Sequence, residues 1–235
     1  MQSRLDAARR ALALAFMSLR AHAEGRMRHF QETYQDSRDW AEDVIRWAAD
    51  QKIDTWLSPE EKKAQDEPLG SWDESTTTNN FWRVESLKSV LWAIGQFDAM
   101  PSYLHEGVDA AFERIPMHAD VAPFLAAAEL RPKEALYAER HIAEFYHWRV
   151  VTEVLRLRGM QPPRGDTYEA VVARALDGID LPVPHDGTDI LVDGTRFIDL
   201  DDERKQAVIS IGYERHLALC WITSDDPWDE ARADT

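Results

Sequence analysis

Apolar residues recur every three or four positions along most of this chain, the spacing that places side chains on one face of an α-helix. The first stretch shows this pattern in Leu5, Ala8, Leu12, Phe16 and Leu19. A secretory signal sequence is the alternative, because arginines precede an apolar run and residues 21–23 read Ala-His-Ala. Asp6 and Arg20 interrupt that run, so we predict a retained amphipathic first helix.

Capping residues and helix breakers predict further helices. Ser58-Pro59-Glu60-Glu61 supplies an N-cap, a proline in the first turn and a capping-box glutamate. Residues 66–80 are polar, contain Pro68 and Gly70, and predict a loop that caps a helix beginning near Phe81. Helices are expected at residues 36–56, just after Ser58, and at 81–97, 108–115, 121–130, 132–158, 168–176 and 202–223.

One segment has the pattern of strands. In residues 188–199, the apolar runs Ile190-Leu191-Val192 and Arg196-Phe197-Ile198 flank Asp193-Gly194, which is typical of a tight two-residue hairpin turn. The fold class predicted is therefore mainly α, a single helical domain over residues 1–235 with one small β-hairpin. Residues 224–235 are expected to form a C-terminal tail.

Charged residues fall inside the apolar stripes of two expected helices. In residues 81–97 Arg83 lies at the edge of the stripe and Glu85 lies between tryptophans, and in residues 202–223 Glu214 and Arg215 occupy comparable positions. An ionised group in an apolar setting needs a partner, and neighbours one or two apart on a helix do not face each other. We therefore predict that Arg83 pairs with Glu214 and Glu85 with Arg215.

These charges and the aromatic residues beside them form a candidate central cluster. Its members are Trp82, Arg83, Glu85, Trp92, Glu214, Arg215, His216 and Trp221. A structural ion-pair network is the favoured interpretation, because such networks occur in cores without catalysing anything. A ligand site is the alternative, and loss of stability on truncating a partner distinguishes the two.

Composition and charge narrow the function. The formal net charge is −16, and residues 159–235 carry 17 acidic and 7 basic side chains, a net of −10. Such a charge disfavours nucleic-acid binding, which relies on neutralising phosphates, and suits a basic protein partner. The candidate partner surface comprises Asp225, Asp226, Trp228 and Asp229. The single cysteine, Cys220, excludes an intrachain disulfide and fits the cytoplasm, and no apolar run is long enough to cross a membrane.

Other combinations of reactive residues have simpler interpretations. His141, Glu144 and His147 diverge too far around a helix for a three-ligand metal site, so a solvated face is expected. Asp186, Asp189 and Asp193 lack the spacing of a calcium loop and fit hairpin turns. Cys220 is expected to be a small buried hydrophobe. No phosphate loop or nucleophile motif is present, so we expect no cofactor and no metal.

Several short blocks, taken in order, resemble a known family. They are Arg9-Arg10-Ala11-Leu12-Ala13-Leu14, Leu57-Ser58-Pro59-Glu60-Glu61, Phe81-Trp82-Arg83-Val84-Glu85-Ser86-Leu87, Leu91-Trp92-Ala93-Ile94-Gly95, Glu214-Arg215-His216-Leu217-Ala218-Leu219-Cys220-Trp221 and Trp228-Asp229 to the terminal Asp234-Thr235. Their order and spacing over nearly the whole chain look like the mainly bacterial family known as domain of unknown function 4272. Cys220 departs from it, because asparagine is expected there. The resemblance implies a mainly helical domain and offers no reaction.

Three functions follow as hypotheses. The first is a non-enzymatic acidic binding protein, of the immunity or adaptor type, that engages a basic protein such as a secreted toxin domain. The second is a small-ligand sensor or hydrolase-like enzyme with a pocket around the candidate central cluster. The third is a structural subunit of an assembly, which would need tryptophans such as Trp72 and Trp228 at the surface.

Overall fold

The computed structural model describes residues 1–104, 109–162 and 165–235, and most of them are helical. The α-helices are α1 (Arg4–His29), α2 (Tyr34–Asp50), α3 (Pro59–Gln65), α4 (Glu74–Ala93), α5 (Asp109–Phe112), α6 (Ala122–Ala127), α7 (Lys133–Leu157), α8 (Tyr168–Asp177) and α9 (Asp202–Thr223). Short 3-10 helices are η1 (Gln31–Thr33), η2 (Ile53–Trp56), η4 (Phe197–Asp199) and η5 (Trp228–Glu230). Strands β1 (Leu191–Val192) and β2 (Thr195–Arg196) form an antiparallel hairpin. The prediction of a mainly α fold with one hairpin is confirmed.

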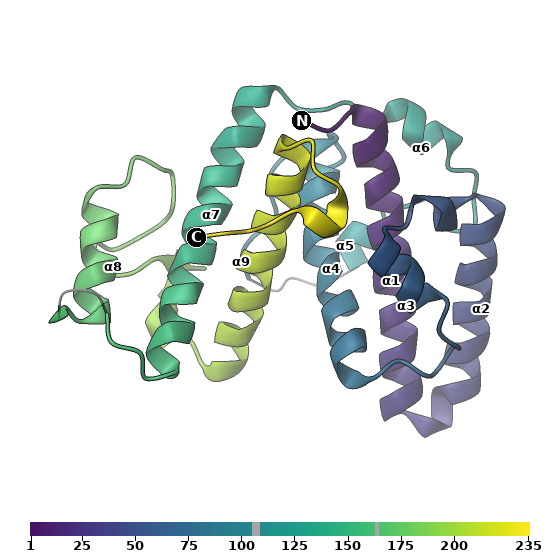
Figure 1. Ribbon diagram of the computed structural model, residues 1–235, viewed down its shortest axis with the longest axis horizontal. Helices are drawn as coiled ribbons and strands as arrows, with labels where there is room; N and C mark the ends of the chain where they lie inside the picture. Colours follow the sequence, from purple (N-terminus) through teal and green to yellow (C-terminus); the bar gives the residue numbers. More distant parts are fainter. Residues whose placement is uncertain (105–108, 163–164) are drawn as a thin grey trace.

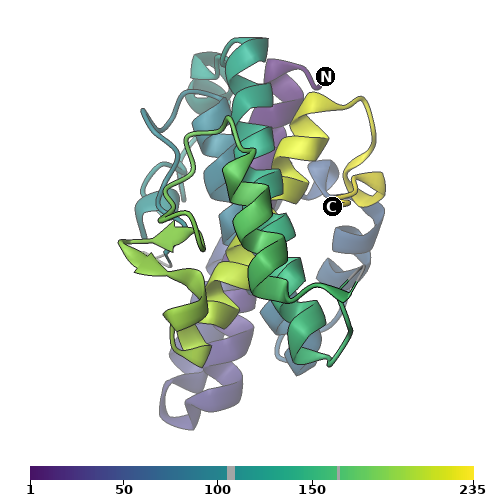
Figure 2. The ribbon, with the colours of Figure 1, turned by 90° about the vertical axis from the view of Figure 1, so that its left-hand side faces the viewer.

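The long helices stand side by side in a row (Figure 1). Helix α4 packs against α1 on one side and α9 on the other, α2 lies against α1, and α7 lies against α9. Figure 2 shows α8 and the hairpin on the outer side of α7. No helix among the described residues is long and apolar enough to cross a bilayer.

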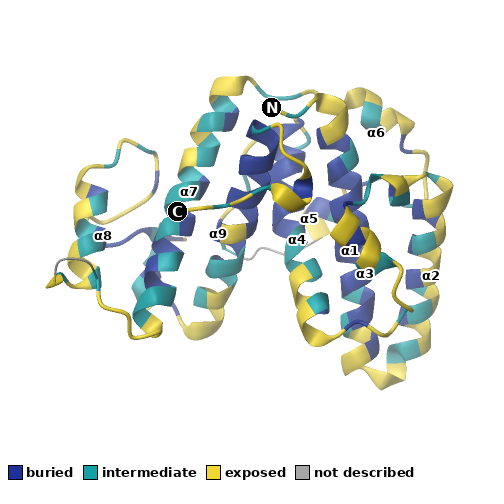
Figure 3. Ribbon diagram, in the orientation of Figure 1, coloured by how far each residue is buried: buried dark blue, intermediate teal, exposed yellow. Residues whose placement is uncertain are grey.

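Helix α1 is the central element on its side of the molecule. Ser3 caps it by accepting a hydrogen bond from the backbone N–H of Asp6. A helix is present here as predicted, but it is buried around most of its circumference between residues 7 and 21 (Figure 3). The expectation of an amphipathic helix was therefore wrong. Alanines in this stretch give neighbouring helices room on several sides, which a single apolar stripe did not reveal.

The polar loop predicted at residues 66–80 is shorter than expected. Helix α4 begins at Glu74, because the side chain of Asp73 accepts a hydrogen bond from the backbone N–H of Thr76 and caps the helix. The Thr-Thr-Thr-Asn-Asn run is therefore helical. Trp72 just before it is buried, and its indole N–H donates to the carbonyl of Ala64. Trp72 is thus not the surface tryptophan that the assembly hypothesis needed.

Other boundaries differ by a few residues. Helix α2 ends at Asp50 instead of continuing to Trp56, because Lys52 takes a left-handed conformation (φ 60°) before η2 begins. The capping box at Ser58 is present as predicted. Position 108, where one helix was expected to begin, lies outside the described residues. In the hairpin, Asp193 and Gly194 both have positive φ (52° and 77°), as the predicted two-residue turn requires.

The buried apolar residues form two main cores, and α9 contributes to both. The first core lies between α1, α2, α4 and the C-terminal half of α9, which supplies Leu219 and Ile222. The second lies between α7, α8, the hairpin and the N-terminal half of α9, which supplies Val208 and Ile211. Glu214 and Arg215 therefore sit where one core gives way to the other. The prediction that residues 1–235 form a single domain stays a prediction.

Candidate functional site

The ion pair between Glu85 and Arg215 connects α4 with α9 and is fully enclosed. Arg215 Nη2 lies 2.8 Å from Oε2 of Glu85, and both side chains have 0% exposure. Oε1 of Glu85 accepts from the ammonium of Lys88 at 2.8 Å. Predicted from the sequence, this pair is confirmed, and because both groups are removed from water, each charge depends on its partner.

Arg215 also fixes the loop that follows α4. Its Nη1 donates to the carbonyl of Pro101 at 2.5 Å, and its Nη2 donates to the carbonyl of Ser102 at 2.7 Å. The ring of Tyr103 covers the guanidinium, with 4.6 Å between its centre and Cζ. Every guanidinium nitrogen of Arg215 therefore donates at least one hydrogen bond, and the group has little capacity left to bind a ligand.

The second predicted pair is also confirmed. Arg83 Nη1 lies 3.2 Å from Oε2 of Glu214, and the Ser86 hydroxyl lies 2.6 Å from the same oxygen. Glu214 is buried, whereas 26% of the Arg83 side chain is exposed. Arg83 also lies over the ring of Trp228, 5.5 Å from its centre. Only the outer edge of the candidate central cluster thus reaches solvent.

The remaining members of the candidate central cluster do not form one site. Trp221 packs edge-on against Trp228, with 5.5 Å between ring centres. Trp92 packs instead under the guanidinium of Arg131, with 4.9 Å between Cζ and the ring centre. Trp82 packs at the border of the second core. The sequence therefore identified the ion pairs correctly, but it grouped aromatic residues that face different neighbours.

His216 forms a buried pair with His147 of α7. The two Nδ1 atoms are 3.0 Å apart, so one neutral ring donates to the other. The solvated face expected for His147 was wrong, because α9 covers it, although His141 is exposed. Burial, together with His147 and Arg140, lowers the pKa of His216 to about 4, and burial lowers the pKa of His147 as well. Both rings are neutral near pH 7.

The histidine pair predicts a pH-dependent stability. The pKa of His216 falls from 6.5 to about 4 on folding, so the unfolded chain binds more protons between these values. The free energy of unfolding should then be highest above pH 6.5, where His216 is neutral in both states. It should fall by on the order of 3 kcal/mol as the pH drops towards 4. Urea unfolding at pH 5 and pH 7 measures this change.

His216→Asn is the variant that isolates the effect, because its amide keeps a polar group near the position of Nδ1 without titrating. It should lose most of the difference in stability between pH 5 and pH 7. His141→Gln removes an exposed histidine from α7 and should retain the difference. An unchanged pH dependence in His216→Asn would contradict the assignment to this pair.

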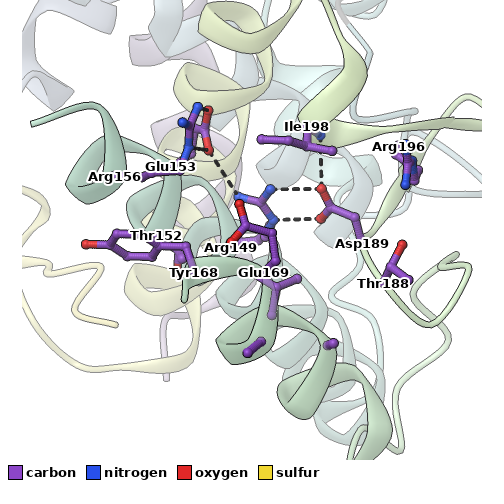
Figure 4. A pocket seen from close by; sticks show the side chains of 13 residues that line it. Arg149, Thr152, Glu153, Arg156, Tyr168, Glu169, Thr188, Asp189, Arg196 and Ile198 are labelled. Atoms are coloured by element: carbon purple, nitrogen blue, oxygen red, sulfur yellow. Dashed lines mark hydrogen bonds and ion pairs between the residues drawn. The ribbon is translucent and has the colours of Figure 1, made fainter. Parts of the chain in front are cut away.

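A cavity that the sequence analysis missed opens between α7, α8 and the hairpin. It has a volume of about 340 Å³, and Figure 4 shows Arg149 and Asp189 facing each other across its wall. Arg149 Nε and Nη2 donate to the two carboxylate oxygens of Asp189 at 2.6 and 2.8 Å. Both side chains are 4% exposed. Asp186 caps the local turn as predicted, but Asp189 pairs with a buried arginine as well.

The tail after α9 returns across the start of the chain. Trp228 is buried, contrary to the surface position that the assembly hypothesis required, and the guanidinium of Arg10 lies 5.0 Å from its ring centre. The carboxylate of Asp229 accepts from the backbone N–H of Glu60 at 3.0 Å, in the first turn of α3. A groove of about 420 Å³ lies between this tail, the start of α1 and the η2–α3 junction.

With this geometry described, comparison with known proteins identifies the family. The model of the family described as Domain of unknown function (DUF4272) matches residues 1–176. The chain belongs to this family. No curated protein and no solved structure matches it.

The DUF4272 match ends within α8. It includes α1, α4 and α7, and therefore Arg83, Glu85 and Arg149, but it does not extend to α9 or the tail. The resemblance seen over nearly the whole sequence is thus shown for residues 1–176 only. In the two ion pairs between α4 and α9, the DUF4272 region supplies Arg83 and Glu85, and the segment after it supplies Glu214 and Arg215.

Proposed function

We propose that this protein is a non-enzymatic binding protein of the immunity or adaptor type, whose acidic C-terminal region engages a basic protein partner in the bacterial cytoplasm. The observation that carries the proposal is the groove beside the tail. Exposed carboxylates line it, together with three tryptophans. Its acidic and aromatic members are Asp6, Asp225, Asp226, Asp229, Trp56, Trp221 and Trp228.

The charge of the groove favours a cationic occupant. The amino group of Met1 pairs with Asp225, and Arg9 lies 3.8 Å from Asp6. Asp229 accepts only a neutral backbone N–H. Within the described part of the chain, the carboxylate of Asp226 has no hydrogen-bond or ion-pair partner. Two carboxylates therefore remain without a cationic partner, and arginine or lysine side chains of a partner would neutralise them.

The tail holds these carboxylates in place before any partner arrives. Trp228 is enclosed by Trp221 and by the guanidinium groups of Arg10 and Arg83. The amide of Gln2 donates to the carbonyl of Asp226 at 3.0 Å. A surface that is already ordered loses less conformational entropy on binding. Apolar ring surface in the groove would also contact the methylene stem of a lysine or arginine.

The enclosed central ion pair disfavours the sensor or enzyme hypothesis in its original form. A pocket was expected around the candidate central cluster, but Glu85 and Arg215 have no exposed surface. Arg215 also donates to two backbone carbonyls besides Glu85. A ligand at this position would have to displace several hydrogen bonds in a buried setting, which is costly.

Charge reversal in the groove tests the proposal. The double variant Asp226→Lys with Asp229→Lys should reduce capture of the basic protein partner at least about tenfold, since several like charges then face it. The wild-type interaction should also weaken between low and high salt. The measurement is a pull-down at both salt concentrations, using as candidate partners the basic proteins encoded beside the gene.

The matched control is Asp177→Lys with Asp180→Lys, which reverses two exposed charges with the same spacing away from the groove. It should capture the partner as the wild type does. Circular dichroism verifies that both double variants fold, because Asp229 also caps α3. Equal loss in both double variants, or no captured basic protein at low salt, would count against the proposal.

A further inference from the structure

We propose that the cavity between α7, α8 and the hairpin is a binding site for a small monocarboxylate with an apolar body. This proposal is independent of the acidic groove, which lies at the tail. At about 340 Å³ the cavity is at the lower end of the range for small-molecule sites. The chemical class of the ligand follows from which polar groups of the cavity wall already have hydrogen-bond partners and which do not.

The carboxylates of the wall are occupied. Asp189 accepts from Arg149 and from the backbone N–H groups of Ile190 and Ile198. Glu153 accepts from Nε and Nη2 of Arg156 at 2.9 and 2.7 Å. These hydrogen bonds from Arg156 hold the pKa of Glu153 below its ordinary value, so that it remains ionised. Neither carboxylate has much capacity left for a donor on a ligand.

The arginines of the wall have donors to spare. Nη1 of Arg149 forms an ion pair with Glu153, but it lies 3.9 Å from Oε2 of that residue, which is beyond hydrogen-bonding distance. It has no hydrogen-bond acceptor among the described residues, although the side chain is 4% exposed. Nη1 of Arg156, whose side chain is 38% exposed, likewise has no acceptor in that part of the chain. Figure 4 shows both guanidinium groups at the same wall, on either side of Glu153. A guanidinium donor at the cavity wall that has no protein acceptor is available to a ligand that supplies one.

One face of the Arg149 guanidinium is covered by protein. The ring of Phe197 lies 4.5 Å from its Cζ. Asp189 holds the two nitrogens on one edge. The orientation of Arg149 is thus fixed by its neighbours, and Nη1 is offered in a fixed direction. A positioned guanidinium of this kind suits a carboxylate, because a charge-assisted hydrogen bond is stronger than a neutral one.

The rest of the cavity surface is mainly apolar, and it favours an apolar body for the ligand. Val172 and Ala173 of α8 and Ile198 of η4 line it. Glu153 and Glu169 carry negative charge beside the arginines, which disfavours a dianion such as a phosphate monoester. A single carboxylate on a short hydrocarbon or aromatic body matches both the spare donors and this lining.

Two monocarboxylates serve as probes, octanoate and 4-phenylbutyrate, and each is compared with its primary amide. Isothermal titration should detect saturable binding of at least one acid, about tenfold tighter than its amide, because the amide cannot form the charge-assisted hydrogen bond. Amide chemical shifts in NMR spectra should change at Val172, Ala173 and Ile198. Absence of saturable binding for both acids would overturn the proposal, and so would equal affinity for acid and amide.

Two variants locate the site without touching the buried Arg149. Ala173→Phe fills the cavity and should weaken binding at least about tenfold, and Arg156→Gln removes one spare donor and should weaken it about fivefold. Arg174→Phe and Arg174→Gln are the controls. Arg174 is exposed on α8, next to Ala173, and does not line the cavity. They should bind as the wild type does. Full binding by Ala173→Phe would place the acid elsewhere and overturn the assignment.

The groove variant separates this proposal from the proposed function. Asp226→Lys with Asp229→Lys should bind the acids normally while it fails to capture the basic partner. Failure of the partner experiment alone would thus leave the carboxylate site standing. Loss of acid binding in this variant would contradict a site between α7, α8 and the hairpin.

Discussion

Arg215→Ala is expected to lower the free energy of unfolding by about 3–5 kcal/mol. The truncation removes a cationic partner from the buried carboxylate of Glu85, to which Lys88 still donates. It also removes the donors that hold the carbonyls of Pro101 and Ser102. The loss is a large share of the stability available to a domain of this size. Equilibrium unfolding in urea at pH 7, followed by circular dichroism and tryptophan fluorescence, measures it.

Arg204→Ala is the matched control on the same helix. Arg204 pairs with Asp201, and both side chains are 63% exposed, so its loss should cost less than about 1 kcal/mol. A comparison of the two variants separates the effect of burial from that of losing any arginine from α9. If Arg215→Ala unfolded at the same urea concentration as Arg204→Ala, the central ion pair would not contribute as we infer.

Asp189→Ala is the second substitution with a large expected effect, again about 3–5 kcal/mol. Asp189 joins Arg149 of α7 to the segment around the hairpin and accepts the N–H groups of Ile190 and Ile198. Removing it leaves the buried guanidinium of Arg149 with the longer ion pair to Glu153, at 3.9 Å, and leaves two backbone donors without their acceptor. The hairpin should therefore loosen from α7. Urea unfolding measures the total loss, and hydrogen exchange at Val192 and Phe197 reports the local one.

The control for this variant is Asp199→Ala, nearby in the sequence. Asp199 pairs with Arg196 at the surface, where both side chains are nearly half exposed, and its loss should cost less than about 1 kcal/mol. Unchanged exchange rates in the hairpin of Asp189→Ala would contradict the anchoring role. A stability loss equal to that of Asp199→Ala would do so as well.

The central ion pairs could be predicted because of where their charges fall. A charge inside an apolar stripe must find a partner outside its own helix, and Arg83, Glu85, Glu214 and Arg215 left few alternatives. The hairpin was predictable for a similarly local reason, since Asp193-Gly194 accommodates two positive φ values. In both cases a few neighbouring residues restricted the structure strongly.

Other features depended on contacts that no local pattern contains. His147 reads as part of a solvated helical face until α9 is placed against it. Trp72 reads as part of a polar loop until Arg20, 4.5 Å from its ring centre, and Ala64 enclose it. The true start of α4 was missed because Thr and Asn are more common at helix caps and in turns than inside helices. The run was therefore interpreted as a loop, whereas Asp73 before it is the cap.

The cavity was missed for a related reason. Arg149 and Asp189 are 40 positions apart, and nothing in either neighbourhood indicates the other. Asp189 also had a sufficient explanation as a turn residue, which hid its second role. A buried arginine on the long helix was the available signal, because Arg149 lies directly before Val150 and three residues after Tyr146, and both of these belong to the second core.

Helix α9 spans 22 residues, a length of about 33 Å at 1.5 Å per residue. Its N-terminal half packs in the second core and its C-terminal half packs in the first. A hinge between the cores would need a flexible joint, yet α9 crosses from one to the other as a continuous helix that Arg215 holds near its midpoint, and α7 also contributes to both cores. Hinge opening between the two cores is therefore disfavoured. Any large motion between them would have to be a shear motion, in which packed helices slide against α9.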